Sequence, residues 1–189
     1  MGGIFTLSRI LCYCFLIFSM ASCTSLPKDM KWEDTKVVMK NLDKLQTGDI
    51  IVKNKIWSEP ISWVGHSAVM VNDSDIGDYP KIGVNYYQVD AYSWLNEERE
   101  VIVLRYNNFD ENFKNKFIEN SKKYSDRQYR PSINKNGDKS FYCSKYVWFI
   151  YKKTAEDLGY KLDIDSDSGL AVLPYDFLNS KELYQVVIE

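Results

Sequence analysis

The sequence predicts an α+β domain in which short strands come first and helices follow. In the first half, short β-prone apolar segments alternate with turn residues, an arrangement typical of an antiparallel meander. In the second half, apolar residues recur at offsets of three and four, the spacing of one buried helical face. These observations favour an antiparallel sheet or small barrel packed against helices.

The first 22 residues have the composition of an exported leader. Arg9 supplies a positive charge, Ile10–Met20 is largely apolar, and small residues precede Cys23. The apolar run is shorter than the ~20 residues that span a bilayer. Residues 20–23 (Met-Ala-Ser-Cys) resemble a bacterial lipobox, in which the cysteine becomes the lipidated N-terminus. The alternative is an uncleaved membrane anchor.

This organisation assigns residues 1–22 to a lipoprotein signal peptide, 23–41 to a lipid-anchored tether and 42–189 to the folded domain. The expected location is the bacterial cell envelope, with the domain attached to a membrane through lipidated Cys23 and its side of the envelope left open. Removal of the leader leaves 167 of the 189 residues, enough for one domain with its own core. The formal net charge of −2 becomes −3 without Arg9, and no basic cluster favours nucleic acid as a partner.

The strands and helices of the domain follow from local pattern. Strands are predicted at Ile50–Val52, Gly65–Val71, Asn85–Ala91, Val101–Tyr106 and Leu183–Ile188, with an acidic turn at Asn72–Pro80. Helices are predicted over Asp110–Tyr124 and Cys143–Leu158, and a short one opens at Pro174. The second of these helices is expected to place Lys145 on its solvent-facing side.

Cysteine usage leaves Cys143 as the only free thiol of the mature chain. Cys12 and Cys14 leave with the leader and Cys23 carries the lipid, so no disulfide can form within one chain. Cys143 lies in the first turn of its predicted helix, where the helix dipole favours the thiolate, the nucleophilic form. The alternative is a buried structural cysteine.

His66 is the only histidine, so it is the one imidazole able to form a couple with Cys143. Such a ring takes the proton of the thiol and later returns it to the leaving group. A third polar group usually fixes the tautomer of the ring. Gln88 and Asp90 share one face of a predicted strand, and we choose Asp90 for this role, with Gln88 as the alternative. A lone histidine with a structural role, and Asp90 as a surface residue, are the competing interpretations.

No cofactor or metal is expected. One histidine and one free thiol do not supply a zinc site, and the chain has no glycine-rich phosphate loop. Asp163–Gly169 is acidic like a calcium loop. However, Ser168 stands where the sixth loop residue should be Gly, and Pro174 stands where the twelfth should be Glu.

Five motifs, taken in order, resemble the permuted papain-like amidases of the YiiX type, relatives of the NlpC cell-wall peptidases and of lecithin–retinol acyltransferase. They are Leu-x-x-Gly-Asp-Ile-Ile from Leu45, Gly-His-Ser from Gly65, Val-Asp-Ala from Val89, Tyr-Cys-Ser-Lys-Tyr-Val-Trp from Tyr142, and Leu-Pro-Tyr-Asp-Phe-Leu-x-Ser from Leu173. The resemblance spans about Leu42 to Val187. It implies a circularly permuted papain-like (NlpC-like) fold with Cys143 as nucleophile and His66 as base. The usual glutamate of the family falls on Asp90.

The resemblance therefore implies an envelope cysteine amidase or peptidase that cleaves an amide bond through a thioester on Cys143. Cell-wall peptide, N-acyl amino acid and lipid amide remain open as substrates. One alternative is an acyltransferase that passes the same acyl group to an amine or alcohol. Another is a non-catalytic envelope lipoprotein that binds peptide or lipid in an aromatic groove.

Overall fold

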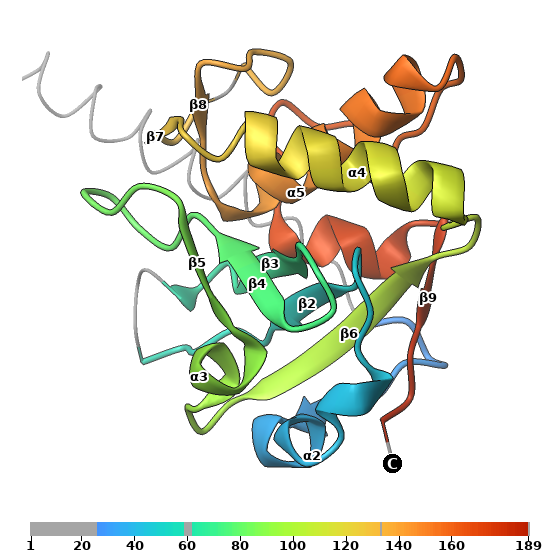
Figure 1. Cartoon of the computed structure of the whole chain (residues 1–189). Helices are drawn as coiled ribbons and strands as arrows, with labels where there is room; N and C mark the ends of the chain where they lie inside the picture. The colour runs from blue at the N-terminus through green and yellow to red at the C-terminus, as the bar shows by residue number, and fades with distance from the viewer. Residues whose placement is uncertain (1–25, 59–61, 133, 189) are drawn as a thin grey trace, which may run out of the picture.

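The computed structural model describes residues 26–58, 62–132 and 134–188 (Figure 1). The predicted signal peptide and the lipidated Cys23 lie outside these residues. Within the described ranges, no helix combines the length and the apolar character needed to cross a membrane.

A seven-stranded antiparallel sheet forms the centre of the domain (Figure 1). Its order is β1-β6-β2-β3-β4-β5, and β9 pairs with β6 on the same side as β1. The strands are β1 (Glu33–Asp34), β2 (Ile50–Lys53), β3 (His66–Met70), β4 (Asp75–Asp78), β5 (Tyr87–Asp90), β6 (Glu100–Tyr106) and β9 (Leu183–Gln185). The sheet stays open at β5, so the small barrel that the sequence left possible does not form.

Helices cover both faces of this sheet. In Figure 1, α4 (Glu111–Lys123) and α5 (Cys143–Asp157) lie above it, and α2 (Thr35–Met39) and α3 (Ala91–Leu95) lie below. The remaining elements are the 3-10 helices η1 (Leu42–Lys44) and η3 (Pro174–Asn179) and a parallel pair, β7 (Gln128–Tyr129) with β8 (Ser140–Phe141).

Strand β6 shows how the two layers of helices define two apolar cores. Ile102 and Leu104 belong to the core under α4 and α5, while Val101 and Val103 belong to the core with α2 and α3. All four side chains are fully buried. Because both faces are covered, residues 101–104 of β6 are apolar without interruption instead of alternating with polar residues.

The predicted antiparallel strands and both long helices are confirmed. Helix α4 begins after Asp110, whose carboxylate accepts the N–H of Phe113 at 2.8 Å as an N-cap. Helix α5 begins at Cys143, as predicted, but it is buried on nearly all sides. Lys145, expected in solvent, is 1% exposed and donates from Nζ to the carbonyl oxygen of Ser140 at 2.8 Å.

The folded domain begins before the predicted boundary at residue 42. Glu33 and Asp34 pair with Val101 and Glu100 of β6, and Val38 of α2 is fully buried. Residues 33–39, which were predicted to belong to the tether, are therefore part of the folded domain. Strand β1 has only two residues, both acidic, so the sequence shows no alternation of apolar and polar residues that would predict a strand there.

The acidic turn predicted at Asn72–Pro80 is also wrong in part, because it contains β4. Ile76 of this strand is fully buried and Asp78 is 1% exposed. Acidic and glycine residues normally indicate a turn, since they are depleted in strands. Here Gly77 leaves room for Tyr86, whose hydroxyl would lie 2.6 Å from a Cβ at that position.

A buried ion pair fixes the turn that leads into β2. Asp49 is fully buried and accepts two hydrogen bonds from Arg105 of β6, Nε to Oδ1 at 2.7 Å and Nη2 to Oδ2 at 2.8 Å. Oδ2 also accepts the N–H of Gln46 at 2.9 Å. The pair thus connects the turn to the strand beside β2.

Replacement of Arg105 by Met is expected to destabilise the domain by about 3–5 kcal/mol, because it leaves the Asp49 carboxylate buried without its cation. Urea denaturation followed by circular dichroism measures the loss. Arg130→Met is the matched control, since Arg130 is exposed, and it should stay within about 0.5 kcal/mol of the wild type. Equal stability of the two variants would contradict this role of the ion pair.

Candidate active site

One pocket brings together Cys143 and His66, which lie 77 positions apart in the chain. The charge of each of these two side chains shifts the pKa of the other. The volume of the pocket is about 270 Å³. The sequence-predicted couple is therefore assembled in the folded chain. Three aromatic side chains and four charged ones also line the pocket: Tyr87, Trp94, Tyr129, Lys53, Asp78, Glu97 and Arg99.

The start of α5 presents the thiol. Cys143 is the first helical residue, and Tyr142 is the N-cap residue without a side-chain capping bond. The backbone N–H groups of a first helical turn have no partner within the helix, and they carry the positive end of its dipole. The thiol therefore lies where a negative charge, on sulfur or on a bound oxygen, is stabilised.

A glycine brings the histidine to the pocket. Gly65 has φ of 76°, and a Cβ at this position would lie 2.8 Å from the carbonyl oxygen of Lys53. Only glycine accepts both the positive φ and the close backbone contact. The next residue, His66, starts β3 opposite Lys53 of β2, with its side chain 18% exposed.

Asp78 of β4 holds the histidine ring. Its Oδ2 lies 2.7 Å from Nε2 of His66 and also accepts the indole N–H of Trp94 at 2.9 Å. The rings of Trp94 and His66 are stacked, with centroids 6.0 Å apart. Since Nε2 is bonded to Asp78, the other ring nitrogen, Nδ1, is left for the thiol. The Asp78–His66–Cys143 series therefore has the connectivity of a nucleophile, a base and an orienting acid.

Asp90, the residue predicted for the orienting role, lies elsewhere. Its exposed carboxylate caps α3 and accepts the N–H of Ser93 at 2.9 Å. Gln88, the alternative, donates to Asp75 at 2.7 Å. Alternation along β5 correctly placed Gln88 and Asp90 on one face, but the pocket is on the other face. There Tyr87 pairs in register with Asp78.

Sequence reasoning missed Asp78 because its segment was interpreted as a turn. Its Oδ1 is buried and has no hydrogen-bond partner among the described residues. One sequence signal could have identified Asp78: if Asp75-Ile76-Gly77-Asp78 is interpreted as a strand, Ile76 and Asp78 lie on the same face. A carboxylate beside a core residue on a strand is the pattern of a functional position.

The electrostatics of the pocket favour an ion pair between the thiolate and the imidazolium. Burial lowers the pKa of His66, but the charges of Asp78 and Cys143, with their hydrogen bonds, outweigh burial and raise this pKa to about 10. Burial raises the pKa of Cys143, yet the charge and hydrogen bond of His66 hold it below the ordinary value for a thiol. The nucleophilic thiolate is thus more populated near neutral pH than it is in an unperturbed thiol.

A charged cluster lines the pocket beside these residues. Lys53 is buried, and its Nζ lies 2.8 Å from Glu97, donates to the carbonyl oxygen of Trp94 at 3.0 Å and sits 3.6 Å from the centre of the Trp94 ring. Arg99 approaches the same Glu97 carboxylate at 3.7 Å. Two cations share one carboxylate, so the cluster carries one net positive charge.

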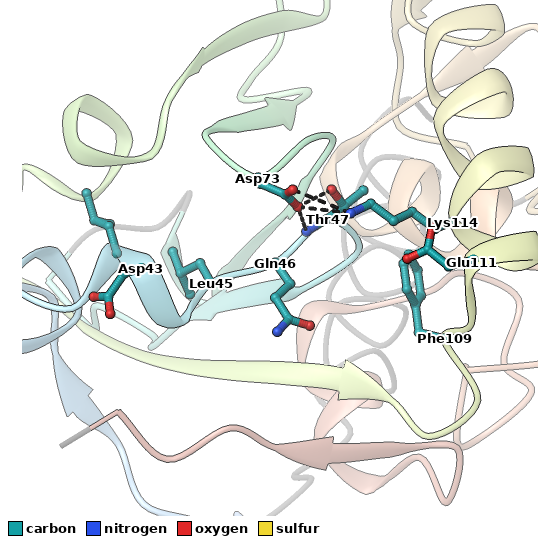
Figure 2. A pocket seen from close by; sticks show the side chains of 9 residues that line it. Asp43, Leu45, Gln46, Thr47, Asp73, Phe109, Glu111 and Lys114 are labelled. Carbon is teal, nitrogen blue, oxygen red and sulfur yellow. Dashed lines mark hydrogen bonds and ion pairs between the residues drawn. The ribbon is translucent and has the colours of Figure 1, made fainter.

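A larger cavity of about 450 Å³ lies away from the thiol (Figure 2). Figure 2 shows Thr47 and Lys114 converging on Asp73, which accepts the Thr47 hydroxyl at 2.6 Å and the Lys114 ammonium at 3.4 Å. None of the residues that line this cavity is a cysteine or a histidine. The Cys143 thiol and the His66 imidazole thus lie in the smaller of the two cavities.

A group with the donor atoms for a metal ion also lies outside the thiol pocket. Carboxylate oxygens of Asp165, Asp167 and Asp176 lie within 4.8 Å of one another. None of the three lines the pocket that holds Cys143. The aspartate group and the thiol pocket are therefore separate sets of side chains.

Comparisons with known proteins agree with this geometry. Residues 37–187 match the family described as permuted papain-like amidase enzyme, YaeF/YiiX, C92 family. A search of curated proteins gives no match. The fold is similar to a crystal structure described as metalloprotein yiiX from Escherichia coli O157:H7, DUF1105. The TM-score is 0.58 at 17% identity, covering 77% of this chain and 98% of that chain.

The family predicted from the five motifs and the predicted α+β papain-like fold are thus confirmed. The structural likeness supports the fold, and the family match, which covers more than half of the chain, supports the chemistry. The chain belongs to the permuted papain-like amidase family of the YaeF/YiiX type, a family of cysteine hydrolases.

Proposed function

We propose that this protein is a cysteine amidase that hydrolyses an amide bond through a thioester on Cys143. In this proposal His66 is the general acid and base, and Asp78 orients it. The observation that supports it is that one pocket holds all three side chains, with Asp78 2.7 Å from Nε2 of His66 and with the charge of His66 lowering the pKa of Cys143.

The first half of the reaction begins from the ion pair. The Cys143 thiolate attacks the amide carbon, and the carbonyl oxygen takes the negative charge in a tetrahedral intermediate. The carbon–nitrogen bond then breaks while His66 donates its proton to the leaving amine, and an acyl thioester remains on Cys143. Asp78 stabilises the imidazolium before transfer and keeps the proton of Nε2 in place afterwards.

The second half releases the acid. Neutral His66 takes a proton from water as the water oxygen attacks the thioester carbon. Collapse of this intermediate breaks the carbon–sulfur bond, releases the carboxylic acid and restores the Cys143 thiolate beside the His66 imidazolium. In both halves the backbone N–H of Cys143, at the start of α5, is the donor that we assign to the oxyanion.

The size of the pocket favours an amino-acid-sized group over a long acyl chain. About 270 Å³ is at the lower end of the range for small-molecule sites. Lys53 and Arg99 are cations of the pocket wall that would pair with a carboxylate on the substrate. We therefore propose a peptide or an N-acyl amino acid, each with a free carboxylate, as the substrate class, in preference to a lipid amide.

The lipobox-like residues that end at Cys23 support an envelope location, in which the lipid would hold the domain near cell-wall peptides. The structural neighbour from Escherichia coli is described as a metalloprotein. For the present chain, each proposed step of the hydrolysis is assigned to a side chain or backbone group of the thiol pocket.

Cys143→Ala is expected to reduce amide hydrolysis to the uncatalysed rate, because no thioester can form. Purified wild-type and variant chains are incubated with a cell-wall peptide digest, and released amines are quantified by mass spectrometry. Intact mass after an acid quench should show an acyl adduct on the wild type alone. Turnover by a Cys143→Ala variant with an unchanged circular dichroism spectrum would contradict the assignment of Cys143 as the nucleophile. If the wild type instead transfers the acyl group to an added amine, the protein is an acyltransferase.

Asp78→Asn is expected to lower kcat by about 10²–10⁴-fold, because an amide does not hold the imidazolium as a carboxylate does. Asp90→Asn is the matched control. It changes an exposed helix cap on the adjoining strand and should leave kcat within a factor of about two. A large loss of kcat in Asp90→Asn, with little loss in Asp78→Asn, would instead support Asp90 as the third catalytic group.

The labelling of Cys143 by iodoacetamide at pH 6 is expected to be at least about 10-fold faster in the wild type than in His66→Ala, because the imidazolium maintains the thiolate. A free thiol of pKa about 8.5 is almost fully protonated at that pH. Equal labelling rates in the two proteins would contradict the proposed ion pair.

The value of kcat/KM should fall on the alkaline side with a midpoint near pH 10, where His66 loses the proton needed by the leaving amine.

A further inference from the structure

Three aspartates converge beside the nucleophile helix, and none of them takes part in the proposed hydrolysis. Asp165 and Asp167 come from the irregular segment after α5, and Asp176 comes from η3. Their carboxylate oxygens lie within 4.8 Å of one another. Asp165 and Asp176 are buried, whereas Asp167 is exposed. Solvent therefore reaches one side of the cluster.

Asp176 provides an independent reason to expect a ligand. The residue is 1% exposed, and its Oδ2 accepts the backbone N–H of Leu173 at 2.6 Å. Its other oxygen, Oδ1, is buried without a hydrogen-bond partner among the described residues. A carboxylate oxygen buried in this way is costly unless a proton donor or a cation meets it.

The charge of the cluster is only partly compensated by protein groups. Lys135 lies 2.5 Å from Oδ2 of Asp165, so one ammonium faces three carboxylates. Two negative charges remain when all three are ionised. A divalent cation would balance this charge, and it would also supply the missing partner of Asp176 Oδ1.

We propose that Asp165, Asp167 and Asp176 bind a calcium ion. Carboxylate oxygens are ligands for hard cations, and Ca²⁺ accepts irregular sets of six to eight oxygens, completed by carbonyls and water. Mg²⁺ demands near-octahedral geometry at shorter distances, which an irregular segment joined to a 3-10 helix supplies less readily. In a calcium loop that begins at Asp163, Pro174 stands at the position of the usual Glu ligand. Here Asp176, two residues later and part of η3, contributes a carboxylate to the cluster.

The ion would act on the start of α5 through the segment that its ligands hold. Val172 lies between Asp167 and Asp176 in the chain. Its carbonyl oxygen accepts the hydroxyl of Ser144 at 2.8 Å, and its N–H donates to the hydroxyl of Tyr142 at 3.1 Å. Both neighbours of Cys143 are therefore bound to this segment. Calcium is assigned a structural role, which keeps the first turn of α5 in place.

The test uses the purified chain in buffer that has been treated with a chelator to remove metal. An extracellular-type calcium site has a Kd of about 10⁻⁴–10⁻³ M, so 10 mM CaCl₂ is expected to raise the thermal midpoint by about 3–10 °C. The same concentration of MgCl₂ controls for ionic strength and should raise it much less. Titration calorimetry should show one calcium site per chain.

Asp167→Asn is the informative variant, because this exposed ligand can change without leaving a buried group unpaired. It is expected to abolish most of the calcium-dependent rise, while Asp43→Asn, an exposed carboxylate in the cavity of Figure 2, should keep it in full. Hydrogen exchange should slow on calcium addition at residues 142–144 and 163–176 in the wild type. No rise with calcium, an equal rise with magnesium, or an equal rise in Asp167→Asn would overturn the proposal. None of these readouts depends on hydrolysis.

Discussion

The hydrogen bond between Asp78 and His66 is the interaction on which the rest of the site depends. A carboxylate that is 1% exposed has given up its hydration, and the imidazole at 2.7 Å and the indole of Trp94 at 2.9 Å replace only part of it. The remaining negative charge favours a protonated ring, and that ring favours the Cys143 thiolate. A residue of strand β4 thus acts, through His66, on the pKa of a thiol at the start of α5.

The fold makes this arrangement possible by joining two layers. Cys143 comes from α5, above the sheet, while Trp94 comes from α3, below it (Figure 1). His66 and Asp78, on β3 and β4, link the two layers within the sheet. Helices on both faces bury the sheet, and burial lowers the local dielectric and strengthens the pairing of charges. The cost is a set of buried polar groups that must each find a partner.

The buried charged groups of this domain differ in how completely they are paired. Asp49 has a bidentate arginine, and Lys53 has a carboxylate, a carbonyl and an aromatic ring. Asp78 and Asp176 each keep one buried oxygen without a partner among the described residues. Both lie where chemistry or ligand binding is proposed, at the thiol pocket and at the aspartate cluster.

The sequence by itself determined the α+β class, the long helices, the family resemblance and the pairing of Cys143 with His66. These depend on local periodicity, on motif order and on the presence of one candidate of each type in the mature chain. Only the tertiary structure decided that Asp78, and not Asp90, meets His66, and that Asp176 joins Asp165 and Asp167. Alternation along a strand shows which residues share a face. Which face meets the nucleophile is set by the pairing and packing of segments far apart in the chain, and no local pattern records it.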